Sequence, residues 1–141
     1  MERIEEQLIL HEGVVLHAYE DHLGYQTIGI GRLIDKRKGG GISNEEALVM
    51  LRNDIKEVCQ RLSHYTWYTE LDCIRQRVIV DMVFNLGLAG FLRFQRTIAA
   101  LEKHDYCEAA KEMLDSRWAS QVGQRAERLA QMMRSGEDYT N

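Results

Sequence analysis

The sequence predicts an α+β fold that is mainly helical, with one small sheet near its N-terminus. Between residues 14 and 33, short runs of aromatic and β-branched residues are interrupted by Gly24, Gly29 and Gly31, a pattern typical of a hairpin or small sheet. Outside this segment, apolar residues recur at helical spacing. A chain of 141 residues with 45% hydrophobic and 28% charged residues indicates one folded domain. This composition excludes a disordered tail or a collagen-like repeat.

The first two helices are indicated by apolar spacing and by residues typical of helix ends. Ile4 and Leu8 predict a short N-terminal helix that ends at Gly13, because glycine is favoured just beyond a helix C-terminus. Ser43, followed three residues later by Glu46, is a capping box that opens a long helix. Its apolar positions keep helical spacing from residue 47 to residue 62.

The second half of the chain is predicted to be helical throughout. Apolar residues occur on nearly every side of the stretch from 71 to 86, which predicts a buried central helix that ends at Gly87. Three shorter helices are expected through residues 91–101, 105–114 and 122–133, followed by a loose tail at 135–141.

The glycine-rich segment predicts a tight hairpin followed by a basic turn. A three-residue loop at 23–25 would place Asp21 opposite Thr27 on the neighbouring strand. Residues 35–41, with the sequence DKRKGGG, form the basic turn that precedes the long helix.

Charge and cysteine content exclude several classes of protein. Eighteen Lys and Arg against 22 Asp and Glu give a net charge of −4, which does not favour binding to nucleic acid or acidic membranes. Cys59, Cys73 and Cys107 lack CxxC spacing, so we expect free, buried thiols rather than a disulfide framework or a zinc ribbon. The first ten residues do not resemble a signal peptide, and the longest uncharged stretch, 82–92, is too short to span a membrane. We therefore expect a cytosolic protein.

Two carboxylates and a hydroxyl near the hairpin are candidates for catalysis. Glu12, Asp21 and Thr27 have the spacing E-x8-D-x5-T, and a helix end and two adjacent strands can bring them together. Hydrolysis of a glycosidic bond needs one protonated carboxyl as acid and one ionised carboxylate. Glu12 suits the acid role because the negative end of a helix disfavours a charged carboxylate. Asp21, on an open hairpin, suits the ionised role.

A metal site is the alternative interpretation of this region. His11, His17 and His22 lie near Asp21 in the sequence, but their spacing matches no zinc pattern on a helix or strand. We therefore expect no metal and no other cofactor, and we expect His17 and His22 to face solvent.

The residues around the candidate site resemble a known family. The stretch HEGVVLHAYEDHLGYQTIGIGRL is similar to phage-type lysozymes, the muramidases of the T-even-phage lysozyme family (glycoside hydrolase family 24), in its E-G, Y-x-D and G-Y-x-T-I-G-I-G elements. Three later segments are also similar, in the same order: ISNEEALVMLRNDI, DMVFNLG and SRWASQVGQRAER. The resemblance covers nearly the whole chain.

The resemblance implies a lysozyme-like, two-lobed fold with a cleft between the lobes. The expected organisation is a single domain, 1–141, with a small β lobe at 13–42, a connecting helix at 43–63 and a helical lobe at 64–141. The N-terminal helix, 2–12, is expected to pack on the helical lobe.

The resemblance also implies the reaction. Family members hydrolyse the β-1,4 bond between N-acetylmuramic acid and N-acetylglucosamine of peptidoglycan with inversion, which requires room for water between the carboxyl groups, about 6.5–9.5 Å apart. Glu12 corresponds to the acid, Asp21 to the carboxylate that positions or deprotonates water, and Thr27 to the hydroxyl that holds that water. Residues expected to contact substrate are Leu33, Phe84, Asn85, Gly29, Gly31 and Arg125. Arg125 also corresponds to an arginine near the acid.

Three positions depart from the family pattern. Arg32 occupies a position where His is common, which puts a fixed charge in place of an imidazole. Two further cleft positions are Phe94 and Glu112, neither of which is a conservative match. The alternative interpretation is therefore a catalytically silent peptidoglycan-binding relative with the same fold.

The expected biology follows from the resemblance. Such a protein is an antimicrobial endolysin that degrades the cell wall and lyses the host of a bacteriophage. We expect a monomer whose partner is peptidoglycan, with no nucleic-acid partner and no stable membrane insertion. It would stay in the host cytoplasm until a separate, holin-type protein permeabilises the inner membrane.

Overall fold

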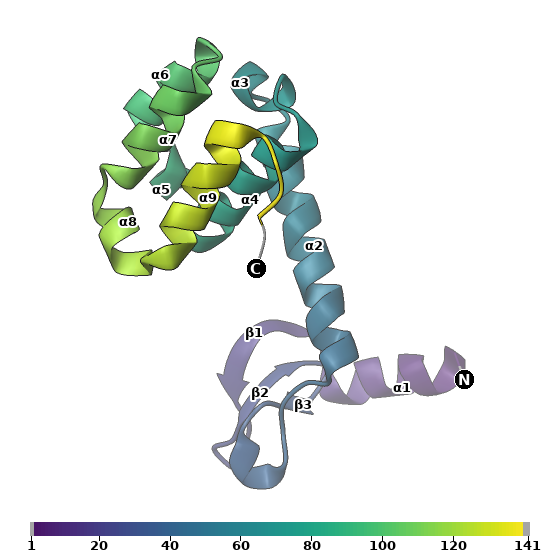
Figure 1. The fold of residues 1–141 in the computed structure, drawn as a ribbon. Helices are drawn as coiled ribbons and strands as arrows, with labels where there is room; N and C mark the ends of the chain where they lie inside the picture. Colours follow the sequence, from purple (N-terminus) through teal and green to yellow (C-terminus); the bar gives the residue numbers. More distant parts are fainter. Residues whose placement is uncertain (1, 140–141) are drawn as a thin grey trace. The chain divides into compact units, whose positions relative to one another are not determined.

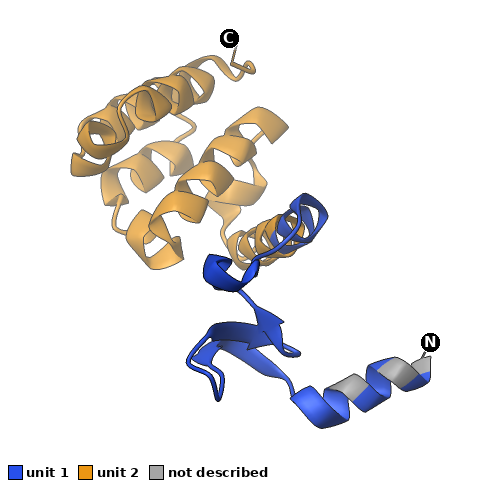
Figure 2. Cartoon of the chain, turned by 90° about the horizontal axis from the view of Figure 1, so that it is seen from below, with its two compact units in different colours: residues 1–50 blue, residues 51–141 orange. Residues whose placement is uncertain are grey.

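The computed structural model describes residues 2–139, except for the side chains of Glu2, Ile4 and Leu8. The chain divides into two compact units, residues 1–50 and 51–141 (Figure 2). Helices surround a core in the second unit, and a three-stranded antiparallel sheet lies in the first, which confirms the predicted mainly helical α+β class (Figure 1). The predicted packing of the N-terminal helix on the helical lobe involves both units and stays a prediction.

Unit 1 contains the first helix and the sheet. Helix α1 (Glu2–Glu12) ends at Gly13, whose φ is 72° and whose N–H donates to the Ile9 carbonyl at 2.9 Å. The apolar spacing of Ile4 and Leu8 that predicted this helix lies on side chains outside the described residues. The sheet has the order β1-β2-β3, with bounds β1 (Val15–Glu20), β2 (Gln26–Gly29) and β3 (Arg32–Leu33).

A basic turn and a long helix follow the sheet. The 3-10 turn η1 (Lys36–Lys38) is capped by Asp35, which accepts the N–H of Arg37 at 3.0 Å. Helix α2 (Asn44–Leu62) begins at the predicted capping box. Ser43 Oγ accepts the Glu46 N–H at 3.1 Å, and a Glu46 carboxylate oxygen accepts the Ser43 N–H at 2.9 Å. The reciprocal pair satisfies two backbone donors at the helix start.

Unit 2 holds the hydrophobic core. Its central helix, α4 (Cys73–Leu86), buries Val78, Ile79, Met82 and Val83, as the apolar pattern predicted. Gly87 follows it, and its N–H donates to the Val83 carbonyl at 2.7 Å. The surrounding helices are α3 (Thr66–Thr69), α5 (Leu88–Leu92), α6 (Gln95–Glu102), α7 (Tyr106–Leu114), α8 (Arg117–Val122) and α9 (Gln124–Ser135).

One of the three shorter predicted helices is interrupted. The helix expected through 91–101 is divided into α5 and α6, because the chain turns at Arg93 and Phe94. The break lies between apolar residues that keep helical spacing, so periodicity alone did not reveal it. The helix expected through 122–133 is present as α9, which begins after Gly123, whereas the short helix α8 before Gly123 was not predicted.

The prediction of a loose tail was wrong as far as Tyr139. Arg77 on α4 donates to both carboxylate oxygens of Asp138, at 2.9 and 3.1 Å. The guanidinium of Arg128 lies 4.7 Å from the centre of the Tyr139 ring. These contacts hold Asp138 and Tyr139 against α4 and α9.

The prediction of buried thiols was also largely wrong. All three cysteines are free, as expected, but Cys73 and Cys107 are exposed and only Cys59 is half-buried. Cys73 is the first residue of α4 and Cys107 is the second residue of α7, so both lie in first turns that the core does not cover.

Within residues 2–139, no helix is both long and apolar enough to cross a membrane.

Candidate active site

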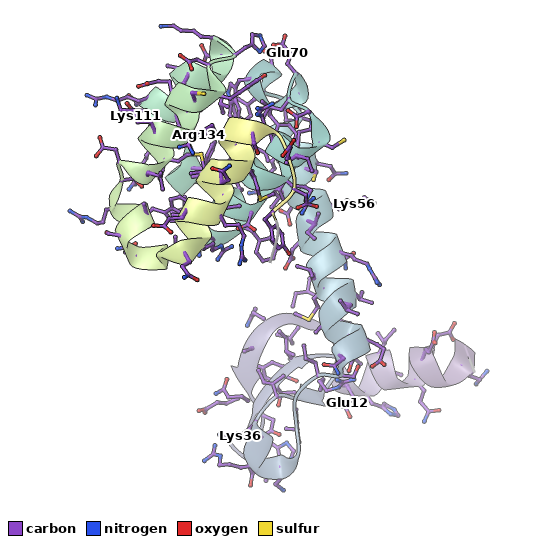
Figure 3. The ribbon with its side chains drawn as sticks, in the orientation of Figure 1. Glu12, Lys36, Lys56, Glu70, Lys111 and Arg134 are labelled. Carbon is purple, nitrogen blue, oxygen red and sulfur yellow. The ribbon has the colours of Figure 1, made fainter. Side chains whose placement is uncertain are left out.

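Glu12 lies at the C-terminal end of α1, next to the sheet of unit 1 (Figure 3). A Cβ atom placed on Gly31 would lie 2.6 Å from Glu12 Oε2 and 2.9 Å from its Cδ. The carboxyl group therefore occupies space that only glycine leaves free at position 31. The side chain is exposed, so its carboxyl group is open to solvent and to a ligand.

Asp21 closes the hairpin turn and is held by backbone donors. Its Oδ1 accepts the N–H groups of Tyr25 and Leu23, each at 2.9 Å. The Tyr25 N–H, followed by the Leu23 N–H, holds the pKa of Asp21 below its ordinary value against the opposing effect of desolvation. Oδ1 thus accepts two hydrogen bonds, whereas none of the described residues donates to Oδ2, which can accept a bond from a water molecule. Hydrolysis of a glycosidic bond by two carboxyl groups requires one of them to be ionised, and Asp21 meets this requirement.

Thr27 lies on β2, the central strand, and is 2% exposed. Its Oγ1 donates to the Tyr25 carbonyl at 3.1 Å. The predicted register was wrong by two residues, because Thr27 pairs with Tyr19 and not with Asp21. Asp21 instead donates its N–H to the Tyr25 carbonyl at 2.8 Å. Since side chains alternate along a strand, this register leaves Asp21 and Thr27 diagonally related on one side of the hairpin.

The other predicted residues of unit 1 lie on the same sheet or directly beside it. Leu33 pairs with Thr27 across β3 and β2. Gly29 and Gly31 have φ values of 72° and 71°, which favour glycine. Among the described atoms, none would lie within 4 Å of a Cβ on Gly29, whereas Glu12 fills that space at Gly31. Close approach of a sugar to these glycines stays a prediction.

Two predicted substrate contacts lie at the end of α4 in unit 2. Asn85 Oδ1 accepts the indole N–H of Trp118 at 2.8 Å, and no hydrogen bond among the described residues uses the Asn85 amide hydrogens. Trp118 is 4% exposed and belongs to the core, as predicted. Phe84 is 45% exposed and presents an aromatic surface.

Arg125 is paired with Asp81, a residue that the sequence reasoning did not assign. Arg125 donates from Nε and Nη2 to Asp81 Oδ1, at 2.9 and 2.6 Å. Both residues and Phe84 line a hollow of about 550 Å³ in unit 2. Asp81 is the only charged residue in the run VIVDMVF, and a charge in such an apolar helix is a signal that a partner exists. The predicted proximity of Arg125 to Glu12 involves both units and stays a prediction.

The three departures from the family pattern have distinct surroundings. Arg32 donates to both carboxylate oxygens of Glu46, at 2.9 and 2.7 Å, and to the Gly41 carbonyl at 3.1 Å. Its charge is therefore matched by the capping box of α2. Phe94 stacks on the core residue Phe91 with ring centres 5.9 Å apart. Phe94 and Glu112 line one hollow of about 360 Å³ in unit 2.

The Arg32–Glu46 pair predicts acid sensitivity. Arg32, followed by the Ser43 N–H, lowers the pKa of Glu46 from 4.5 to about 2. Because the pKa of Glu46 is lower in the folded than in the unfolded protein, the ionised carboxylate stabilises the fold. This stabilisation is present above pH 4.5 and is lost as the pH falls toward about 2. Glu46→Gln should therefore lower the thermal unfolding midpoint near neutral pH, and the difference from wild type should vanish near pH 2. Thermal unfolding followed by circular dichroism between neutral pH and about pH 2 measures the difference in unfolding midpoint.

Glu45→Gln is the matched control, because it removes the same charge from the first turn of α2. It should have a smaller effect at neutral pH, since among the described residues Glu45 makes no ion pair. A Glu46→Gln difference that persisted undiminished at the lowest pH would contradict the assigned role of the pair.

Among the residues that the structure describes, no three His, Cys, Asp or Glu side chains are arranged to hold a metal ion. His17 and His22 are exposed, as predicted.

Comparison with known proteins shows the family of the chain. The family model described as phage lysozyme matches residues 10–136. The chain is 29% identical to probable T4-type lysozyme 1 of Dictyostelium discoideum, with 94% of each chain covered. It is 30% identical to an endolysin of Acyrthosiphon pisum secondary endosymbiont phage 1, over 74% of this chain and 70% of that protein. It is also 27% identical to the pre-baseplate central spike protein Gp5 of Enterobacteria phage T4, covering 93% of this chain but 27% of that protein. The chain therefore belongs to the phage lysozyme family.

Proposed function

We propose that this protein is a muramidase that hydrolyses the β-1,4 bond between N-acetylmuramic acid and N-acetylglucosamine of bacterial peptidoglycan, with inversion. Family membership supports a lysozyme-type activity. The observation that carries the proposal is the arrangement in unit 1. There, the Glu12 carboxyl group lies against Gly31, and the hairpin of the same sheet holds Asp21 by two N–H groups. This arrangement supplies the two carboxyl groups that the reaction requires.

Glu12 is the general acid in this mechanism. It donates its proton to the glycosidic oxygen as the bond between that oxygen and the anomeric carbon breaks. A water oxygen forms the new bond to the anomeric carbon, and the proton that it releases passes to Asp21. Exchange with solvent then returns a proton to Glu12 and removes one from Asp21.

The hydrogen bonds of Thr27 and Asp21 support a defined orientation of that water. Thr27 uses its only hydroxyl hydrogen on the Tyr25 carbonyl, so its oxygen can only accept from a ligand. Asp21 Oδ2 is also an acceptor. A water that donates one hydrogen to each of these oxygens directs its lone pair away from both of them, and we place the anomeric carbon there.

Unit 2 supplies contacts to the glycan. Phe84 offers an exposed aromatic face of the kind that stacks on sugar rings, and Asn85 retains its amide hydrogens for a hydroxyl or acetamido oxygen. Arg125, held by Asp81, offers its remaining N–H groups. We propose that these residues of unit 2 contact the glycan strands of peptidoglycan.

The biological role proposed is host lysis by a phage endolysin. The endolysin relative supports this role, and the negative charge of the chain gives no reason to expect binding to nucleic acid. Access to peptidoglycan from the host cytoplasm would then depend on a separate protein that permeabilises the inner membrane.

Product analysis tests the proposal. Purified protein incubated with peptidoglycan should release new reducing ends, and mass spectrometry should find muropeptides cleaved after N-acetylmuramic acid. The first anomer formed should be α, because inversion of a β bond yields it. Amidase or peptidase fragments would contradict the proposed bond, and an initial β anomer would contradict the mechanism.

The alternative is a silent peptidoglycan-binding relative, suggested by Arg32 in place of the usual His. Pairing of Arg32 with Glu46 favours an active enzyme, because the added charge is matched within unit 1. Binding to wall fragments without release of reducing sugar would support the silent alternative.

A further inference from the structure

The peptide groups of Tyr25 hold both side chains that position water in the proposed reaction. The Tyr25 N–H donates to Asp21 Oδ1 at 2.9 Å. Its carbonyl accepts the Thr27 hydroxyl at 3.1 Å and the Asp21 N–H at 2.8 Å. A displacement of the Tyr25 backbone would therefore shift hydrogen-bond partners of Asp21 and Thr27 together.

The ring of Tyr25 is in turn held by Lys38. The Lys38 Nζ lies 4.7 Å from the ring centre, within the distance of a cation–π contact. Lys38 is the last residue of η1, and its N–H donates to the Asp35 carbonyl at 3.2 Å. A capped turn outside the hairpin thus places the ammonium group on the ring.

We propose that the Lys38–Tyr25 pair is a positioning element of the active site, which fixes the Tyr25 backbone and through it Asp21 and Thr27. The inference rests on the proposed function for the catalytic roles of Asp21 and Thr27. Lys38 also acts through its charge. Lys38 and His22 are the charged or titratable side chains that favour the ionised form of Asp21, in addition to its two backbone donors.

The first test is kinetic. Lys38→Met should lower kcat by about two- to fivefold, the factor expected from an exposed cation–π pair, with little change in KM. Lys38→Arg should restore the rate, because guanidinium groups also bind aromatic faces. In a Tyr25→Leu background, Lys38→Met should lower kcat by a smaller factor than in wild type, since the ring is gone and only the direct effect of the charge on Asp21 remains.

Lys36→Met is the matched control. Lys36 lies on the same turn (Figure 3) and carries the same charge, but the described contacts place Lys38, not Lys36, over the ring. Loss of Lys36 should leave kcat near that of wild type and above that of Lys38→Met. Equal effects of the two substitutions would show a general effect of charge and would overturn the proposal.

The second test does not depend on activity. Carboxyl NMR titration should show that Lys38→Met raises the pKa of Asp21 relative to wild type, and that Lys36→Met raises it less. An unchanged Asp21 pKa together with an unchanged kcat in Lys38→Met would refute the positioning role. If wild type releases no reducing sugar, the proposed function fails, and the NMR titration still decides whether Lys38 acts on Asp21.

Discussion

Glu12→Gln is expected to abolish nearly all release of reducing sugar from peptidoglycan. Glutamine keeps the size of the side chain and its place beside Gly31, but its amide cannot donate a proton to the leaving oxygen. Loss of a general acid lowers kcat by about 10²- to 10⁴-fold. Initial rates of reducing-end formation by wild type and variant, at equal protein concentration and near neutral pH, measure the effect.

Glu6→Gln is the matched control for this change. Glu6 is an exposed residue of the same helix, so its substitution removes the same charge from α1 without touching the site. It should retain the wild-type rate. Binding of Glu12→Gln to wall fragments should also be retained, because the neutral side chain still fits. A Glu12→Gln variant with undiminished kcat would exclude Glu12 as the acid.

Elements with a strong local signal could be predicted from the sequence. The capping box was predicted from two residue types at one spacing, Ser43 and Glu46, and both of its hydrogen bonds are present. The buried axis of unit 2 followed from apolar residues on all sides of 71–86. Both signals are carried by residues that are close together in the sequence, which is why local reasoning was sufficient to predict these elements.

The arrangement of the site was predicted only in part, because it depends on register and on long-range pairs. The hairpin register was two residues off, since Asp21 does not extend the strand but closes the turn by accepting two N–H groups. Local spacing also does not show that Arg32 would bond Glu46, 14 residues away, or that Arg125 would bond Asp81, 44 residues away. Such pairs are set by the tertiary fold.

Gly31→Ala is the second substitution expected to have a large effect, and it acts on Glu12 without changing it. The new Cβ would lie 2.6 Å from Glu12 Oε2, so the carboxyl group must move away from the sheet. Misplacement of a catalytic group by about 1 Å can lower the rate by about 10²-fold. We therefore expect kcat to fall by about 10²-fold or more. Alanine at a φ of 71° also costs about 1 kcal/mol of unfolding free energy, which denaturant melts will show separately.

Gly29→Ala separates backbone strain from displacement of the acid. Gly29 has a φ of 72°, so alanine there incurs a similar strain, but among the described atoms none would lie within 4 Å of the new Cβ. Its kcat should stay near that of wild type, and a rise in KM would indicate that a sugar passes close to this glycine. A similar loss of kcat in both variants would attribute the effect to strain in the sheet. A loss confined to Gly31→Ala would show that position 31 is glycine because the acid needs that space.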